Sequence, residues 1–225
     1  MPQTLALIHT SPSLTPLFTA LCAKHLPAVQ LVHMVDESLI RNTIAAGHLE
    51  KRTMRRVIGM VESAVAAGAD AVLVTCSSIG AATTLAQQVF DCPVLRIDEA
   101  MAELAVTLGS RIGVLATLRT TLEPTCALVR SKAPARGVEL VECLCEGAFD
   151  AVMAGDTATH DRIVAQQLQQ LAAQVEVVVL AQASMARILA SLPPNTLPVP
   201  VLASPELAVL RVRDVLAQRS AEPMA

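Results

Sequence analysis

The stretch "VLVTCSSIG", residues 72–80, joins a short apolar run to a group of small polar residues. An apolar run of this length is typical of a buried strand, and the "AATTLAQQV" that follows it is typical of a helix. A similar stretch, "VVLAQASMA", occupies residues 178–186 and has Gln182 where the first stretch has Cys76. This strand-to-helix junction and its repetition indicate the fold.

Short apolar runs occur eight times and alternate with longer segments of helical periodicity. The runs are continuous rather than alternating, which is typical of parallel strands that helices cover on both faces. The sequence therefore predicts an α/β layered architecture with parallel sheets. The predicted strands are Leu5–His9, Gln30–Val35, Ala71–Thr75, Val94–Ile97, Arg111–Thr117, Glu139–Cys143, Val175–Leu180 and Val199–Leu202.

Three pairs of segments repeat in the same order. The stretch "LALIHTSPS" (residues 5–13) resembles "IGVLATLRT" (residues 112–120), and Cys76 precedes its counterpart Gln182 by 106 residues. The third pair, "PVLRIDEAMAELAV" from Pro93 and "PVLASPELAVLRV" from Pro200, has an offset of 107 residues. We therefore predict two similar Rossmann-like lobes related by a pseudo-twofold axis, residues 1–97 with 205–225 and residues 98–204.

Ligands of open parallel sheets bind beyond the carboxyl ends of the strands. Two such lobes facing each other would place Thr10 and Cys76 on one wall of a cleft. Thr117 and Gln182 would form the other wall. We therefore expect Cys76 and Gln182 to oppose each other across a bound molecule.

Three predicted helices begin after a residue that is typical of a helix N-cap. Ser13 precedes Leu14, Asp98 precedes "EAMAELAV", and Asp156 precedes "TATHDRIVAQQL". Oxygen atoms of such side chains accept hydrogen bonds from free N–H groups of the first turn. We expect these three residues to cap their helices.

The composition argues against several classes of protein. Hydrophobic residues make up 53% of the 225, enough for a sizeable core, but no run approaches the roughly 20 uncharged residues that span a bilayer. The opening "MPQTLALIHT" lacks the basic flank and cleavage site of a signal peptide, so we expect a cytoplasmic protein. The net charge of −3 and the absence of Trp and Tyr argue against a nucleic-acid partner and favour a small polar ligand.

The six cysteines form no C-x-x-C pair. We expect Cys22, Cys92 and Cys126 to be small buried hydrophobes. Cys143 and Cys145 would share one face of a strand near Glu146, but no histidine lies at ligand spacing, so we predict no metal site.

Cys76 is the cysteine whose position indicates chemistry, because it lies where a strand ends and a helix is predicted to begin. Free N–H groups at a helix N-terminus stabilise a thiolate and can lower a thiol pKa from about 8.5. Ser77 and Ser78 add hydroxyl groups at which a carboxylate would dock. A thiolate base beside an anion site suits the removal of a proton next to a carboxylate.

The segments "IHTSPS", "VLVTCSSIG", "RIGVLATLRTTLEPT" and "VVLAQASMARI" resemble the aspartate/glutamate racemase superfamily over essentially the whole chain. This resemblance implies two α/β lobes that enclose a small carboxylate, without a cofactor. Racemising members use one cysteine per lobe to remove and return the α-proton, and the resemblance implies Cys76 as the first of them. The substrate-binding residues that we predict are Thr10, Ser11, Ser77, Ser78, Thr117, Thr120, Thr121 and Ser184.

The second cysteine of that pattern is missing. Its position holds Gln182, or Ala181 if the alignment slips by one residue, and neither side chain is a base near neutral pH. Another group could supply a second base, and Arg187 could reach a substrate carboxylate. Alternatively, one thiol could shuttle a proton on a single face. The candidate second bases are Asp36, Glu37 and His160.

We therefore predict an isomerase of the racemase type that acts on a small carboxylate through a single thiolate, Cys76, with Gln182 hydrogen-bonded to the substrate. A single-cysteine decarboxylase or tautomerase is one alternative. Decarboxylating relatives, however, keep their cysteine in the second lobe and use a tyrosine, which this chain lacks. A binding protein for a small acid, without catalysis, is the other. Homo-oligomers are plausible for this class of fold, and no membrane partner is expected.

Overall fold

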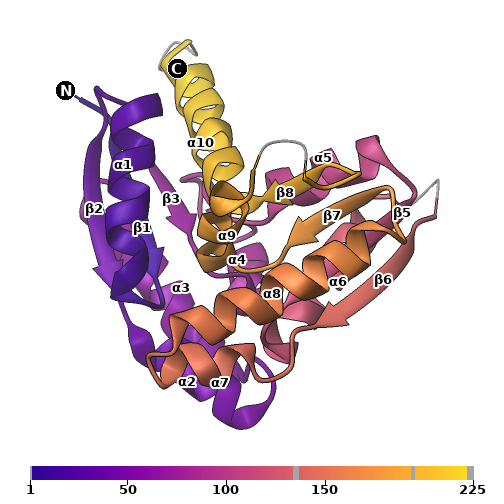
Figure 1. Cartoon of the computed structure of the whole chain (residues 1–225). Helices are drawn as coiled ribbons and strands as arrows, with labels where there is room; N and C mark the ends of the chain where they lie inside the picture. The colour runs from indigo at the N-terminus through magenta and orange to yellow at the C-terminus, as the bar shows by residue number, and fades with distance from the viewer. Residues whose placement is uncertain (1, 134–136, 194–195, 222–225) are drawn as a thin grey trace. The chain divides into compact units, whose positions relative to one another are not determined.

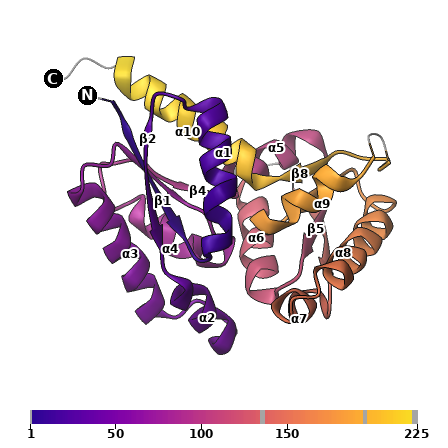
Figure 2. The same cartoon turned by 60° about the vertical axis from the view of Figure 1, so that its left-hand side comes forward.

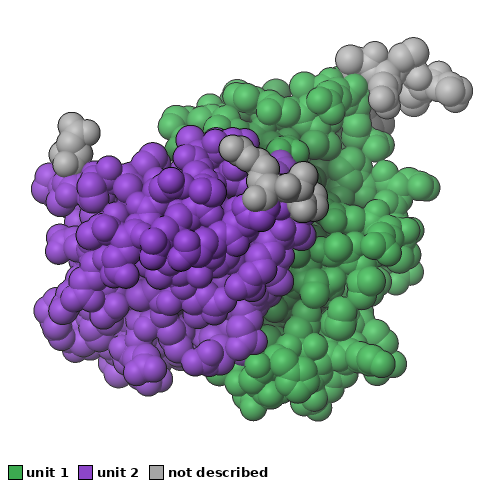
Figure 3. Space-filling model, turned by 90° about the vertical axis from the view of Figure 1, so that its right-hand side faces the viewer, with its two compact units in different colours: residues 1–97, 205–225 green, residues 98–204 purple. Residues whose placement is uncertain are grey.

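The computed structural model describes residues 2–133, 137–193 and 196–221. The chain forms two compact units, residues 1–97 with 205–225 and residues 98–204, which Figure 3 draws in green and purple. We call them unit 1 and unit 2. Each contains one parallel sheet of four strands with helices around it (Figure 1).

The sheet of unit 1 has the strand order β2-β1-β3-β4, and all of its neighbouring strands are parallel. Its strands are β1 (Thr4–His9), β2 (Gln30–Val35), β3 (Ala71–Val74) and β4 (Val94–Arg96). The helices that accompany them are α1 (Thr15–His25), α2 (Glu37–Ala46), α3 (Lys51–Ala66), α4 (Gly80–Ala86) and α10 (Ser204–Ala221), with the short 3-10 helices η1 (Pro12–Leu14) and η2 (Ser77–Ile79).

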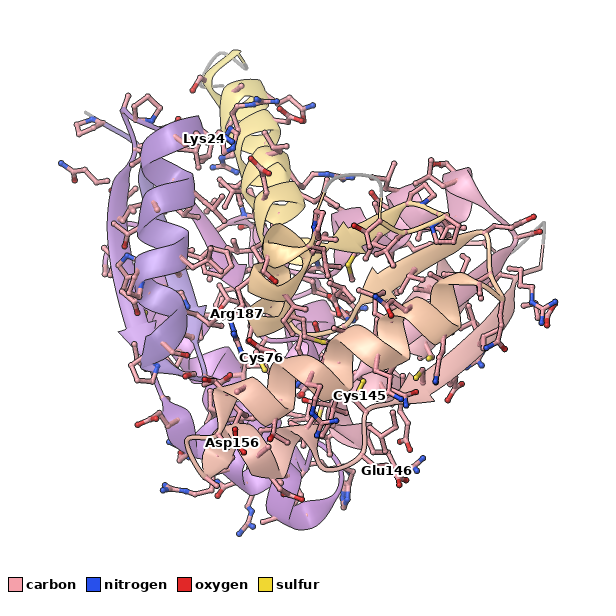
Figure 4. All side chains as sticks on the ribbon, viewed as in Figure 1. Lys24, Cys76, Cys145, Glu146, Asp156 and Arg187 are labelled. Atoms are coloured by element: carbon pink, nitrogen blue, oxygen red, sulfur yellow. The ribbon has the colours of Figure 1, made fainter. Side chains whose placement is uncertain are left out.

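Helices cover both faces of this sheet, and α1 and α3 lie on opposite sides of β1 in Figure 2. Alternate residues of the strands point to opposite faces. Ile8 and Val74 accordingly pack in the same core cluster as Val57 and Val61 of α3. On the other side, Lys24 of α1 (Figure 4) binds Glu206 of α10 at 2.8 Å, so the C-terminal helix is joined to the first one.

The sheet of unit 2 has the order β6-β5-β7-β8 and is also parallel throughout. Helices α6 and α8 lie on opposite sides of β5 (Figure 2). Its strands are β5 (Arg111–Ala116), β6 (Glu139–Leu144), β7 (Val177–Leu180) and β8 (Val201–Ala203). Its helices are α5 (Glu99–Leu108), α6 (Arg119–Ser131), α7 (Ala148–Met153), α8 (Thr157–Ala172) and α9 (Ala186–Ser191), with the 3-10 helix η3 (Ala183–Met185).

The predicted α/β class and the two similar lobes are confirmed. All eight predicted strands are present, and their observed ends differ from the predicted ends by at most two residues. In both units the second strand of the lobe lies at one edge and the fourth at the other. The internal repeat of the sequence therefore corresponds to a repeat of sheet topology.

The predictions for the edge strands and for Ser13 are wrong. The edge strands β2 and β6 are not covered on both faces, because Val32 and Val35 of β2 remain exposed and β6 contains no fully buried residue. Ser13 does not cap a helix, because Pro12 starts a 3-10 turn there and it is the Ser11 hydroxyl that accepts from the Ser13 N–H.

The two aspartates predicted as helix caps behave differently. Asp156 caps α8 as predicted, by accepting a hydrogen bond from the Thr159 N–H at 2.9 Å. Asp98 occupies the N-cap position of α5, but its carboxylate makes no capping bond. Within the described part of the chain, no helix is both long and apolar enough to cross a membrane.

Candidate functional site

Cys76 lies just beyond the carboxyl end of β3, where the prediction placed it (Figure 4). It holds the N-cap position of η2 in an extended conformation, with φ −137° and ψ 117°. The η2 turn leads into α4 at Gly80. A side chain at Gly80 would come within 2.4 Å of the buried Arg96 guanidinium, so glycine lets α4 begin close to β4.

Four hydrogen bonds converge on the half-buried Cys76 sulfur. They come from the Thr10 hydroxyl, the Ser78 N–H and hydroxyl, and the Ile79 N–H, and each of them lowers the thiol pKa. Burial has the larger effect, so the net pKa of Cys76 is raised. The expected lowering of the Cys76 pKa is therefore wrong, although the four donors at the sulfur would stabilise a thiolate.

The local secondary structure also differs from the prediction. The prediction assumed that an α-helix begins at Cys76, whereas α4 begins only at Gly80 and η2 has three residues. A short 3-10 turn aligns few peptide dipoles, so its contribution at the sulfur is small. Individual N–H and O–H donors, rather than a helix dipole, surround Cys76.

The predicted hydroxyl residues of unit 1 fall into two groups. Thr10, Ser77 and Ser78 are at most 5% exposed and lie at the ends of β1 and β3, as Cys76 does. Ser11 instead lies nearer the surface, where its hydroxyl bonds to the Ser13 hydroxyl at 2.8 Å and caps η1. Thr10, Ser77 and Ser78 thus remain the candidates beside the sulfur.

Unit 2 repeats the arrangement with an amide in place of the thiol. Gln182 holds the N-cap position of η3 with φ −117° and ψ 135°, like Cys76 in η2. Its Oε1 accepts from the Thr117 N–H at 2.6 Å and from the Thr117 hydroxyl at 3.0 Å. Gln182, and not the fully buried Ala181, is therefore the structural counterpart of Cys76.

The remaining predicted residues of unit 2 differ in their surroundings. Thr120 has a buried hydroxyl that finds no hydrogen-bond partner among the described residues. Thr121 is buried in the first turn of α6, and its carbonyl accepts from the Thr125 hydroxyl. Ser184 is exposed, although Ser78, its counterpart in unit 1, is buried. Of these three, Thr120 has a hydroxyl still available to a ligand.

The candidate second bases have structural partners. Asp36 caps α2 through the Ser38 N–H at 3.0 Å and also pairs with Arg56, whereas Glu37 is exposed in the first turn of α2. His160 is buried against Asp161, with 2.7 Å between Nδ1 and Oδ1.

Arg187, which Figure 4 labels at α9, belongs to the same group as His160. It forms a two-fold ion pair with Asp161, with both distances at 2.6 Å. Neighbouring groups thus already hold Asp36, His160 and Arg187.

Sequence reasoning missed a pair of imidazoles beside the cysteine site, one buried and one half-buried. His9 is fully buried, and its Nδ1 lies 2.8 Å from the Thr75 hydroxyl. Its Nε2 lies 2.9 Å from Nδ1 of His33 on β2, and the two rings stack. Burial and the neighbouring His33 lower the pKa of His9 to about 4. A histidine at the end of an apolar strand is the signal that could have identified this pair, because a buried imidazole needs partners.

The other cysteines have simpler environments. Cys22 and Cys126 are buried as predicted, and burial raises their thiol pKa values to about 11 and about 12. Cys92 is only half-buried, with its sulfur 3.3 Å from the Ala69 carbonyl oxygen. Cys145, labelled with Glu146 in Figure 4, is buried and shares a hydrogen bond with Cys143. The described residues contain no cluster of three His, Cys, Asp or Glu that would hold a metal ion.

Comparison with known proteins agrees with this architecture. The model of the Asp/Glu/hydantoin racemase family matches residues 7–212, so the chain belongs to that family of racemase-type enzymes. Comparison of the sequence with curated proteins gives no significant match.

Three solved structures show the same fold at low sequence identity. Glutamate racemase from Francisella tularensis, in complex with D-glutamate, has a TM-score of 0.75 and 16% identity, covering 100% of this chain and 84% of its own. Allantoin racemase from Klebsiella pneumoniae has a TM-score of 0.73 and 15% identity, covering 96% of this chain and 89% of its own. Aspartate racemase from Picrophilus torridus has a TM-score of 0.73 and 14% identity, covering 99% of this chain and 96% of its own.

Proposed function

We propose that the protein is a racemase-type isomerase of small carboxylates in which Cys76 is the single proton-transferring residue, without a metal or an organic cofactor. The observation that supports this most is the pairing of equivalent positions in the two units. In unit 1 the Thr10 hydroxyl binds a thiol, whereas in unit 2 the Thr117 hydroxyl binds an amide. One unit thus supplies an acid–base group and the other supplies a group that only hydrogen-bonds.

The proposed chemistry begins with ionisation of the Cys76 thiol. The thiolate takes the proton from the carbon next to the substrate carboxylate, so an S–H bond forms and a C–H bond breaks. The electron pair of that bond moves into the carboxylate as an enediolate. Hydroxyl and N–H donors placed at those oxygens stabilise this charge more than the charge of the ground state. The planar enediolate then turns its opposite face to the sulfur, and the Cys76 S–H returns a proton there, so the S–H bond breaks, a C–H bond forms and the thiolate is regenerated. Return on the original face, after the S–H has exchanged with solvent, gives exchange without inversion.

The hydroxyl residues have separate proposed roles. In unit 1, Ser77 and Thr10 bind the substrate carboxylate, with Thr10 moving from sulfur to ligand as the thiolate is consumed; Ser78 holds the sulfur. In unit 2, the Thr120 hydroxyl, which has no hydrogen-bond partner in the described part of the chain, gains one from the substrate. Ser11, Thr121 and Ser184 belong to the wider binding region in this proposal, although Ser11 caps a turn and Ser184 is exposed.

Gln182 serves the same substrate in this proposal, but not as a base. Its Oε1 is already occupied by the Thr117 N–H and hydroxyl, while its Nε2 lies 2.7 Å from the Thr117 oxygen. An amide nitrogen has two hydrogens and can donate the second one to a substrate oxygen. Gln182 and Thr117 thus form a neutral, donor-rich partner for an anionic substrate.

A deuterium-exchange experiment tests this function. The protein is incubated in D₂O with a panel of single-enantiomer amino and hydroxy acids, and deuterium entry at the α-carbon is followed by NMR. Chiral chromatography measures inversion in the same samples. A single thiol on one face predicts exchange that is faster than inversion, and both are lost in Cys76→Ser. Equal rates of exchange and inversion would contradict the single-base mechanism. A ligand that raises Tm in both wild type and Cys76→Ala, with no exchange, would indicate a binding protein.

Decarboxylation is the second candidate, and the raised pKa of Cys76 favours it. A protonated thiol can donate its proton to the carbanion that remains when a C–C bond breaks and CO₂ leaves. The resulting thiolate then regains a proton from water. Release of CO₂ from substituted malonic acids, with deuterium from D₂O in the product, would support this reaction over isomerisation.

We also propose that the protein acts in the cytoplasm. All six cysteines are free thiols, as a reducing compartment allows.

A further inference from the structure

Four polar side chains form a line through unit 1 that the proposed chemistry does not use. The His9 imidazole is in the middle, with Thr75 at Nδ1 and His33 at Nε2, at 2.8 and 2.9 Å. His33 Nε2 in turn lies 3.1 Å from the Thr19 hydroxyl of α1. The line thus joins the ends of β1 and β3, through His33 within β2, to the first helix.

The hydrogen bonds at Thr75 determine which nitrogen of His9 bears the proton. The Thr75 hydroxyl donates its single proton to the Ile8 carbonyl at 3.0 Å, so it can only accept from His9. His9 therefore carries a proton on Nδ1. In the neutral ring Nε2 is then an acceptor, so His33 donates from its own Nδ1. The Thr19 hydroxyl, which also lies 2.8 Å from the Thr15 carbonyl oxygen, then gives its proton to His33 Nε2 instead. Each nitrogen of His9 thus has one hydrogen-bond partner: Nδ1 donates to Thr75 and Nε2 accepts from His33.

This bond lies directly beside the cysteine site. The last paired residues of β1 and β3 are Ile8 and Val74, and His9 and Thr75 follow them. The next residue on each strand is Thr10 or Cys76, and those two side chains make the hydroxyl-to-sulfur bond. The ends of β1 and β3 are thus joined by two hydrogen bonds one residue apart, His9–Thr75 and Thr10–Cys76, which hold the spacing between the two strands.

We propose that His9 is a positioning residue for Cys76: its bond to Thr75 holds the ends of β1 and β3 at the spacing that keeps the Thr10 hydroxyl on the sulfur. His33 supports this role by donating to Nε2 and so selecting the Nδ1–H form of His9. Phe18 packs against the His9 ring, with 5.6 Å between the ring centroids, and restricts its rotation. The importance of this role for catalysis rests on the proposed function, but its effect on the thiol does not.

The test measures the reactivity of the Cys76 thiol directly. Folded protein is alkylated with iodoacetamide over a range of pH, and mass spectrometry quantifies the peptide that contains Cys76. The variants are Thr75→Val, His9→Leu and the double variant. If Thr10 loses its hold on the sulfur, the apparent pKa of Cys76 rises and alkylation at about pH 8 slows by roughly threefold or more. Because both substitutions break the same His9–Thr75 bond, the double variant should be alkylated at the same rate as each single variant.

Two further variants separate positioning from simple loss of stability. His9→Asn retains an N–H donor near the position of Nδ1 and should restore wild-type alkylation. Thr53→Val is the matched control, because the buried Thr53 hydroxyl has no hydrogen-bond partner among the described residues. It should leave the alkylation profile unchanged. If His9→Leu does not fold, Thr75→Val and His9→Asn decide the question.

The outcomes for the inference and for the proposed function are distinct. Wild-type alkylation in Thr75→Val, or a failure of His9→Asn to restore it, overturns the positioning role even if the enzyme exchanges deuterium. Shifted alkylation in a protein that exchanges no deuterium supports the positioning role and contradicts the proposed enzyme. A Cys76 that iodoacetamide does not modify at any pH contradicts both.

Discussion

Mild acid should destabilise the protein through His9. This ring is fully buried, and its pKa is lowered from 6.5 to about 4. Below its ordinary pKa the histidine of the unfolded chain binds a proton that the folded chain excludes. Stability is therefore fully present above about pH 6.5 and is lost as the pH falls toward 4.

The size of this effect follows from the shift. A lowering from 6.5 to about 4 corresponds to roughly 3 kcal/mol when the transition is complete, and to roughly 2 kcal/mol between about pH 7 and about pH 5. Such a loss is a substantial part of the 5–15 kcal/mol of stability that is typical of folded domains.

Urea unfolding followed by far-ultraviolet circular dichroism measures the effect, since the chain has no Trp or Tyr for fluorescence. The free energy of unfolding of wild type should fall more steeply with acid than that of His9→Asn, which cannot bind the proton. His48→Asn, a change at an exposed histidine, is the control and should follow wild type. Parallel curves for wild type and His9→Asn between about pH 7 and about pH 5 would refute a buried, neutral His9.

Three other predictions concern the site and the core. Because the pKa of Cys76 is raised and the thiolate is the active form, deuterium exchange should keep rising above about pH 8.5; a plateau below about pH 7 would contradict this. Gln182→Glu keeps an acceptor for Thr117 but adds a negative charge, so KM should rise by about tenfold or more with Tm retained, and an unchanged KM would exclude Gln182 from the substrate. Gly113→Ala should cost about 1–3 kcal/mol in urea unfolding, since its Cβ would lie 2.8 Å from Cγ of Leu171; an unchanged midpoint would show that α8 moves freely.

The fold was predictable because its signals are local. Each strand is a continuous apolar run, and the repeat of "VLVTCSSIG" in "VVLAQASMA" reflects two sheets with the same strand order. The same repeat aligned Gln182 with Cys76, and the similar N-cap conformations of the two residues agree with that alignment. The exposure of β2 and β6 was not predictable, because an edge position depends on strand order and not on composition.

The details of the site depend on long-range pairing, which the sequence alone does not specify. His9 meets Thr75 and His33, which are 66 and 24 residues away, and the sequence gives no register from which to derive those contacts. The direction of the Cys76 pKa shift likewise depends on a balance between burial and four donors. The sequence around Cys76 indicated hydrogen-bond donors at the thiol, but it did not indicate how deeply the thiol is buried.

The most direct test of the mechanism is the entry of solvent deuterium at the α-carbon of a small carboxylate, measured side by side for wild type and Cys76→Ser. Transfer by a single thiol predicts exchange in wild type that outpaces inversion, and its loss in the serine variant, whose hydroxyl is far too weak an acid to replace the thiol. Exchange that persists at the wild-type rate in Cys76→Ser would contradict the assignment of Cys76 as the proton-transferring residue.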